Sequence, residues 1–88
     1  IELQPEDPFI LDSLGWVNFR LGNYLLAVDA LKKAFELRSD PEIAAHLGEV
    51  LWVQGDVEEA RRIWEIGLAH EDGAKNPVLQ DTIHRLDP

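Results

Sequence analysis

The stretch Leu14–Tyr24 reads LGWVNFRLGNY, and the stretch Leu47–Val57, which begins 33 residues later, reads LGEVLWVQGDV. Each copy has Leu-Gly, then six residues, then Gly followed by a polar and an apolar residue. A small residue follows each copy at the same distance, as Ala27 and Ala60. A repeat of about 33 residues is typical of helix pairs that stack into an array. The pattern therefore predicts an all-α fold of stacked antiparallel helix pairs.

The composition narrows the classes of function. The 88 residues suffice for one small domain, and a hydrophobic fraction of 45% is enough for a core. The sequence has no cysteine, which excludes disulfides and cysteine-based zinc sites. Acidic residues outnumber basic ones 17 to 8, and a net charge of −9 argues against nonspecific binding to nucleic acid or anionic membranes. No apolar run approaches the roughly 20 residues that span a bilayer, so we expect no direct membrane insertion by this segment.

Three Asx-Pro pairs predict helix starts, at Asp7-Pro8, Asp40-Pro41 and Asn76-Pro77. The Asx side chain accepts hydrogen bonds from free backbone N–H groups, and proline suits the first helical position. Two turns, Gly22-Asn23 and Gly55-Asp56, separate the helices within each pair. We therefore expect helices over residues 8–21, 24–38, 41–54, 57–70 and 77–86, and no strand.

Apolar residues at helical spacing predict the side of each helix that faces the core. For the first two helices these are Leu11, Leu14, Val17, Phe19 and Leu21, then Leu25, Val28, Leu31, Ala34, Phe35 and Leu37. For the last three they are Ile43, Ala44, Leu47, Val50 and Leu51, then Ala60, Ile63, Trp64, Gly67 and Leu68, then Val78, Leu79, Thr82, Ile83 and Leu86. Gly67 inside a helix predicts close approach of a neighbour, and Asp56 with Glu59 predicts a capping box.

The segment Ile1–Asp7 resembles the end of a helix, because similar wording recurs at Phe35–Asp40. We therefore expect at least one further repeat upstream. The expected organisation is a repeat tail at residues 1–7, repeats at residues 8–40 and 41–74, and a short, fairly polar capping helix at residues 75–88.

The two copies resemble the tetratricopeptide repeat. In the first copy the matching residues are Leu11, Leu14, Gly15, Asn18, Ala27, Leu31 and Ala34. In the second they are Ala44, Leu47, Gly48, Leu51, Ala60, Trp64 and Gly67. The family's first Trp and its Tyr are replaced in both copies, and the proline expected near Ser39 is absent, so the stacking angle could differ while the fold stays.

A narrower resemblance rests on four runs, Ile10–Trp16, Asp40–Trp52, Ala60–Trp64 and Asn76–Leu79. They are similar to the C-terminal end of a family of bacterial tetratricopeptide lipoproteins. Members in Gram-negative bacteria are anchored at the outer membrane and face the periplasm, and at least one is an adaptor that presents substrates to a C-terminal-processing protease. The resemblance implies a scaffold or adaptor whose lipid-anchored cysteine lies outside this sequence. The sequence alone does not identify the compartment.

Tetratricopeptide arrays bind peptides in a concave groove lined by the first helix of each pair. The resemblance implies a groove lined by Phe9, Asp12, Trp16, Phe19, Arg20, His46, Glu49, Trp52 and Val53. Helical spacing independently places Asp12, Trp16 and Arg20 on one face. Trp16 suits an interface anchor or packing against a neighbouring helix, while core packing is favoured for Phe19 and Trp52 and strongly for Trp64.

The residues predicted to line the groove indicate the chemistry of a partner that could bind there. In some family members, lysine, arginine and asparagine in the groove clamp a partner's terminal carboxylate. The matching positions here hold Asp12, Trp16, His46 and Glu49, so we do not expect this chain to bind a terminal carboxylate in that way. An acidic, aromatic groove suits a protein or peptide partner with basic and apolar side chains. His46 and Glu49 alone are weak evidence for a metal site, and we expect no cofactor.

No catalytic motif or phosphate loop is present, so the sequence predicts a non-enzymatic interaction module. The alternative is a purely structural end of a longer superhelix. In that case its exposed N-terminal repeat face would stack on a further repeat or self-associate.

Overall fold

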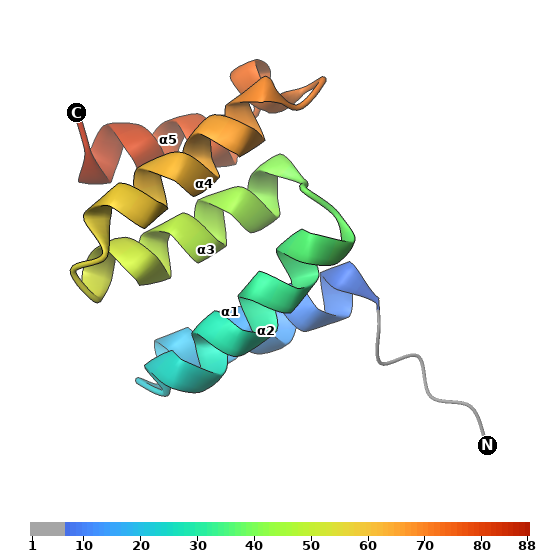
Figure 1. Cartoon of the computed structure of the whole chain (residues 1–88), viewed down its shortest axis with the longest axis vertical. Coiled ribbons are helices and arrows are strands. Elements are labelled where there is room, and N and C mark those ends of the chain that lie inside the picture. The colour runs from blue at the N-terminus through green and yellow to red at the C-terminus, as the bar shows by residue number, and fades with distance from the viewer. Residues whose placement is uncertain (1–6) are drawn as a thin grey trace.

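Five α-helices form two stacked pairs and a final single helix in the computed structural model, which describes residues 7–88 (Figure 1). The helices are α1 (Pro8–Arg20), α2 (Tyr24–Leu37), α3 (Pro41–Val53), α4 (Val57–Ala69) and α5 (Pro77–Leu86), with a short 3-10 turn, η1 (Gly73–Lys75), before α5. The expected bounds agree to within one residue, and residues 7–88 contain no strand. The expected helix tail at residues 1–6 lies outside the described residues.

The three predicted Asx caps are confirmed. The side-chain oxygens of Asp7, Asp40 and Asn76 each accept a hydrogen bond of 2.9–3.0 Å from a backbone N–H of the first turn that follows. Pro occupies the first helical position in all three cases. These local signals fix where α1, α3 and α5 begin.

The turns inside the two pairs are alike, because Gly22 and Gly55 both take positive φ, 85° and 92°. Glycine alone adopts this left-handed conformation without strain, and it ends a helix in the way both copies require. The predicted capping box at Asp56 is wrong. Asp56 has a ψ of 67° and makes no side-chain cap bond, whereas the capping residue Asp40 has an extended ψ of 142°. Glu59 instead accepts hydrogen bonds from Arg62.

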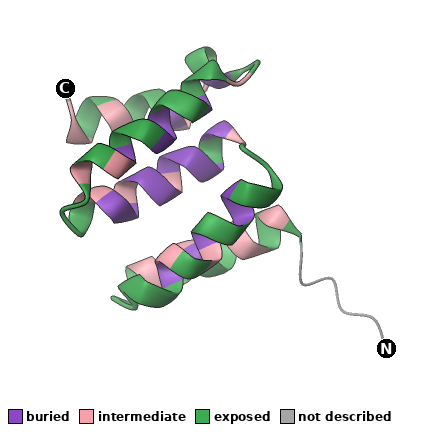
Figure 2. Cartoon of the chain, in the orientation of Figure 1, coloured by how far each residue is buried: buried purple, intermediate pink, exposed green. Residues whose placement is uncertain are grey.

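The α3–α4 pair lies between the α1–α2 pair and α5 (Figure 1). Helix α2 packs on α3, and α5 packs against both α3 and α4. α3 is accordingly the most buried helix (Figure 2), and all five of its predicted core residues are buried. Trp64 of α4 is buried as predicted.

Some of the apolar residues predicted to face the core are exposed instead. They are Leu14, Val17, Leu21, Leu25, Leu37 and, at the margin, Leu68. The prediction is wrong for Leu14, Val17 and Leu21 because, within residues 7–88, no helix covers that side of α1. Burial is therefore concentrated in the second pair.

Glycines allow the helices to approach closely. A Cβ on Gly15 would lie 2.6 Å from Leu31 Cγ, and one on Gly48 would overlap the Trp64 indole. A Cβ on Gly67 would lie 2.6 Å from Ala44 Cβ, which confirms the close approach predicted there. Leu31 and Trp64 occupy equivalent positions, 33 residues apart. In each pair, therefore, a glycine of the first helix makes room for a large side chain of the second.

Candidate protein-binding face

α1 and α3 meet through a small cluster of polar and aromatic side chains. His46 Nδ1 lies 2.8 Å from Asp12 Oδ1, within hydrogen-bonding distance, and both side chains are largely buried. The ring of Trp16 stacks on the His46 imidazole, with centroids 4.2 Å apart and planes tilted by 25°. Because Asp12 and Trp16 come from the first pair and His46 from the second, the cluster couples the two pairs.

Aromatic rings continue along α1 from this cluster. Phe19 lies 5.0 Å from Trp16 between ring centroids, and Tyr24, at the start of α2, lies 5.5 Å from Phe19. Trp16 and Phe19 are partly buried and pack against the core cluster. Trp16 and Phe19 thus pack against the core while each residue stays partly exposed, so the two roles considered for Trp16 are compatible.

Glu49 is engaged by the final helix. Arg85 Nη2 of α5 donates a hydrogen bond of 2.8 Å to Glu49 Oε1, and the Glu49 side chain is mostly covered. This hydrogen bond and the negative charge of Glu49 raise the pKa of the Arg85 guanidinium above its ordinary value. Any ligand that uses the Glu49 carboxylate would therefore have to share it with Arg85.

The remaining predicted residues are more dispersed. Trp52 stacks on Trp64, with ring centroids 5.5 Å apart. The guanidinium of Arg61 lies 5.5 Å from the centroid of the Trp52 ring. Phe9 is exposed near the first turn of α1, with the Arg38 guanidinium 5.7 Å from its ring centroid. Other exposed members of the set are Arg20 and Val53. The structure thus brings together Asp12, Trp16, Phe19 and His46, and it holds Glu49 and Trp52 in separate contacts.

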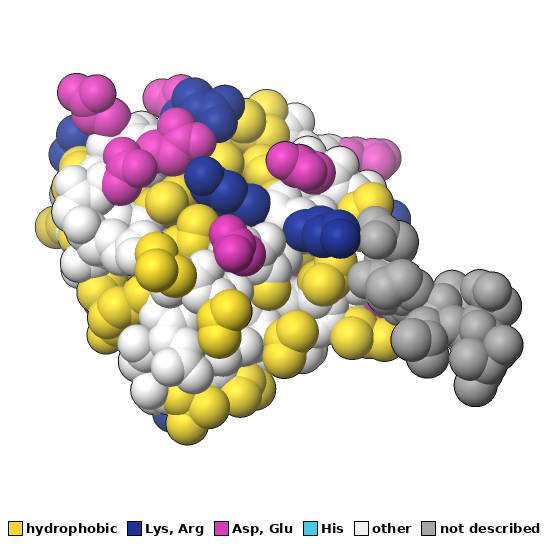
Figure 3. All heavy atoms as spheres, turned by 60° about the horizontal axis from the view of Figure 1, so that its bottom comes forward, with side chains coloured by type: hydrophobic (Ala, Val, Ile, Leu, Met, Phe, Trp, Pro, Cys, Tyr) yellow, Lys and Arg dark blue, Asp and Glu magenta, His cyan; other side chains and the backbone are white. Residues whose placement is uncertain are grey.

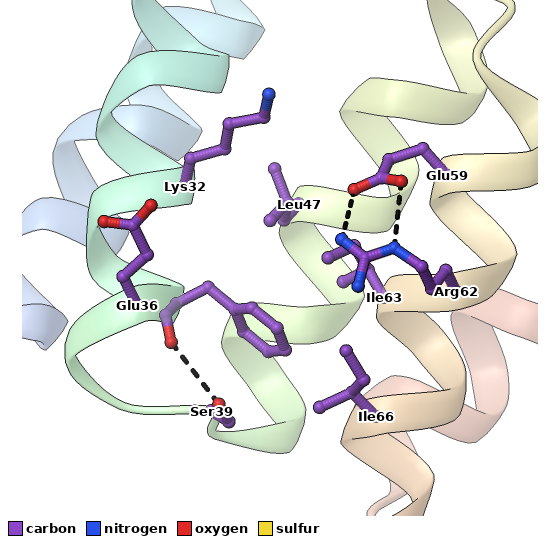
Figure 4. A pocket seen from close by; sticks show the side chains of 9 residues that line it. Lys32, Glu36, Ser39, Leu47, Glu59, Arg62, Ile63 and Ile66 are labelled. Atoms are coloured by element: carbon purple, nitrogen blue, oxygen red, sulfur yellow. Dashed lines mark hydrogen bonds and ion pairs between the residues drawn. The ribbon is translucent and has the colours of Figure 1, made fainter.

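A hollow of about 350 Å³ lies between α2 and α4 (Figure 4). Its apolar lining is Phe35, Leu47, Ile63 and Ile66, and its charged lining is Lys32, Glu36, Glu59 and Arg62. Lys32 and Glu36 lie on the α2 side, and Glu59 and Arg62 lie on the α4 side (Figure 4). The hydrogen bond from Arg62, 2.6 Å at its shortest, is the main reason that the pKa of Glu59 lies below its ordinary value. Sequence reasoning missed this hollow because its residues come from three different helices.

Within residues 7–88 no group of three or more His, Asp or Glu side chains could hold a metal ion. His46 and Glu49, considered above as a metal pair, bond to Asp12 and Arg85. None of the described helices has the length and apolarity needed to cross a membrane.

Part of the chain is similar in sequence to a known protein. Over 48 residues, 54% of this chain, the sequence is 50% identical to a TPR repeat-containing protein of Pseudomonas aeruginosa. The tetratricopeptide resemblance is confirmed. The matched stretch spans 8% of that protein's length. The match therefore supports the tetratricopeptide-type helix pairs but says nothing of the activity of the whole relative. No protein-family model matches the chain.

Proposed function

We propose that this chain is a non-enzymatic protein-interaction module that binds a segment of a partner protein at its α1–α3 face. We define this face by Asp12, Trp16, Arg20, His46 and Val53. One observation carries the proposal: Trp16 is stacked on His46 at the junction of two tetratricopeptide-type pairs, and the residue is only partly buried. Tryptophan fixed in a preformed site is a favoured anchor, because little side-chain freedom is lost when a partner binds.

The charges on the face shape the partner we propose. Asp12 on the face and Glu49, elsewhere on α3, supply negative charge, but Asp12 already lies against His46 and Glu49 against Arg85. Displacing such a pair costs part of what a new pair would gain. We therefore propose that apolar contact with Trp16 dominates and that basic groups of the partner add orientation at the rim.

The test begins with selection of binders from a displayed library of random peptides. Affinities of the selected peptides are then measured by isothermal titration calorimetry. Trp16→Ala should weaken binding about 30-fold, the loss that corresponds to a hot-spot residue of about 2 kcal/mol. Arg20→Ala, at an exposed position of the same face, should weaken it less.

Leu25→Ala is the matched control, because Leu25 is a highly exposed apolar residue on α2 outside the proposed face. It should leave the affinity unchanged. If Trp16→Ala keeps its helical circular dichroism and binds within twofold of the parent, and Arg20→Ala also binds normally, the α1–α3 face is not the binding site.

We further propose, on the lipoprotein resemblance, that the module belongs to a periplasmic adaptor anchored at the outer membrane. The support is the four runs quoted from the sequence, and the test needs the full-length protein. Labelling cells with radioactive palmitate should label it, and fractionation should place it with the outer membrane. An unlabelled protein found outside the outer-membrane fraction would contradict the adaptor proposal but leave the peptide-binding proposal standing.

The alternative role, a structural end that stacks or self-associates, is favoured by the exposed apolar side chains of α1. It uses a different surface from the α1–α3 face, so the two roles are compatible. Sedimentation velocity over a range of concentrations tests self-association. A monomer at all concentrations would exclude that form of the alternative.

A further inference from the structure

The α2–α4 hollow, the hollow of about 350 Å³ seen in Figure 4, lies where these two helices make no substantial contact with each other. Both helices pack instead on α3, which lies between them (Figure 1). Phe35, Leu47 and Ile63 form an apolar floor and are only 8%, 1% and 4% exposed, whereas Ile66 of α4 is 37% exposed. The volume lies at the lower end of the range for ligand pockets, about 300–1,000 Å³, so the hollow can take bulky side chains.

The charged side chains around the hollow are not equally available to a partner. Arg62 donates two hydrogen bonds, of 3.0 and 2.6 Å, to the carboxylate of Glu59, so these two groups satisfy each other. In Figure 4 the Lys32 side chain extends toward the space between the helices, whereas the Glu36 carboxylate turns away from it. Within residues 7–88 Lys32 makes no ion pair. The mouth of the hollow therefore carries two cations and one anion, and Lys32 is the charge left to bind a partner.

The repeat itself does not require a cation at this position. Glu65 follows Lys32 by 33 residues and Ala69 follows Glu36, so the second pair has no basic group in the equivalent place. The smaller hollow between α4 and α5 is lined without lysine or arginine. The basic group over the apolar floor is therefore specific to the α2–α4 hollow and is not a consequence of stacking.

The charge of the whole chain makes this position unusual. Acidic residues outnumber basic ones 17 to 8, so most of the surface repels an acidic group. On the face shown in Figure 3, acidic and basic side chains are interspersed over the upper part, with hydrophobic side chains among them. An unpaired cation beside an apolar hollow favours a partner in which a carboxylate lies next to a bulky apolar group.

We infer that the α2–α4 hollow is a second docking site, for a segment of a partner protein that places a bulky apolar side chain in the hollow and a neighbouring Asp or Glu side chain on Lys32. Contact with Ile66 and the edge of Phe35 supplies most of the affinity, because an exposed ion pair alone contributes little. The ion pair with Lys32 fixes the orientation of the segment. The hollow shares no residue with the α1–α3 face, so the chain can hold two partner segments at once.

The test selects displayed random peptides that bind the chain but not its Ile66→Lys variant, in which a long charged side chain enters the hollow. Circular dichroism first checks that the variant is folded, and Lys32→Glu, at an exposed position, replaces it in the selection if it is not. Leu68→Lys is the matched control, because Leu68 is also 37% exposed on α4 but lines a different hollow. We expect peptides that share Leu, Ile or Phe beside Asp or Glu and that bind Leu68→Lys as tightly as the parent chain.

Reversing the charges tests the chemistry of the occupant. Lys32→Glu should weaken binding of the selected peptides about tenfold, because it replaces an attraction by a repulsion. Replacing the acidic residue of the peptide by lysine should likewise weaken binding to the parent chain and restore it to Lys32→Glu. A folded Trp16→Ala variant should bind the selected peptides unchanged, so this test and that of the α1–α3 face can fail separately.

Two results would overturn the inference. One is a selection that yields no peptide able to distinguish the parent chain from the folded hollow variant, or only peptides without an acidic residue that bind Lys32→Glu normally. The other is loss of the selected peptides in Trp16→Ala, because the peptides would then be bound at the α1–α3 face.

Discussion

The first and second helix pairs are built from matching residues but have different surroundings. Ile10, Leu14 and Val17 repeat as Ile43, Leu47 and Val50, yet only the second set is buried. The second pair has α2 on one side and α5 on the other, whereas the outer side of α1 is open in the described chain. The difference teaches that in a stacked array the contribution of a residue is set by its neighbouring pair as much as by its own helix.

The largest expected effect comes from the same substitution made in both pairs. Leu47→Ala should lower the free energy of unfolding by about 3 kcal/mol, the usual cost of truncating a fully buried leucine. Leu14→Ala should lower it by less than about 1 kcal/mol, because the side chain is already half exposed. Leucine and alanine have similar helix propensities, so the comparison reports packing. Urea unfolding measures both, and equal losses would contradict the difference in burial.

A second comparison concerns the glycines that let each pair close. Gly48→Ala should destabilise the chain by about 1–3 kcal/mol, because its Cβ would overlap the rigid Trp64 indole. Gly15→Ala should cost less, since Leu31 is a flexible side chain that can partly give way. Thermal unfolding checks the order of the two losses.

The double variant Gly48→Ala with Trp64→Leu tests the mechanism. It gives the second pair the leucine that the first pair carries as Leu31, so the cost of Gly48→Ala should fall in this background. A cost that stays the same when Trp64 is replaced would show that the clash with the indole is not the cause.

A smaller effect concerns α5, the helix that packs against the second pair. Glu49→Gln removes the charged partner of Arg85 and should cost about 0.5–1 kcal/mol, a small loss because solvent screens the half-exposed Arg85 side chain. The loss should appear as faster deuterium exchange in α5, with α1 unaffected. Glu36→Gln, an exposed acidic residue of α2, is the control. Equal changes in α1 and α5 would contradict a local role for the ion pair.

The smallest effect is a pH dependence at the end of α5. Arg61 Nε donates a hydrogen bond of 2.8 Å to Asp87 Oδ2, and this bond lowers the pKa of Asp87 below its ordinary value of 3.8. A lowered folded-state pKa means that the contact stabilises the fold above about pH 3.8 and that this contribution is lost as the pH falls through the lowered value. Carboxyl NMR titration should show the lowered pKa, and Arg61→Ala should return it toward 3.8. An equally low pKa in the variant would rule out Arg61 as the cause.

The sequence predicted the helices because their signals are local. Asx-Pro starts and the positive-φ glycines act within a few residues, and the observed bounds agree to within one residue. The buried stripe of α3 was predicted for the same reason. The open stripe of α1 could not be distinguished from it, because the two stripes have the same residues and differ only in the neighbouring helix.

The sequence predicted several residues of the candidate site but not which of them contact one another. Helical spacing placed Asp12 and Trp16 on one face, but spacing within α1 says nothing about His46 on α3. The partner of Glu49, Arg85, is 36 residues away and depends on how α5 docks. The predicted cap at Asp56 is wrong because a capping side chain also needs an extended backbone, and the ψ of Asp56, 67°, is not visible in the residue type.

One measurement tests the central claim, that a partner segment binds at the α1–α3 face. Backbone NMR spectra of the labelled chain, recorded with and without a library-selected peptide, locate the bound peptide. We predict that the largest shift changes fall on Trp16, Arg20 and His46, with little change at Ile10, Leu14 and Val17. Shift changes confined to Ile10, Leu14 and Val17, with Trp16 and His46 undisturbed, would contradict the account and place recognition on the exposed apolar side of α1 instead.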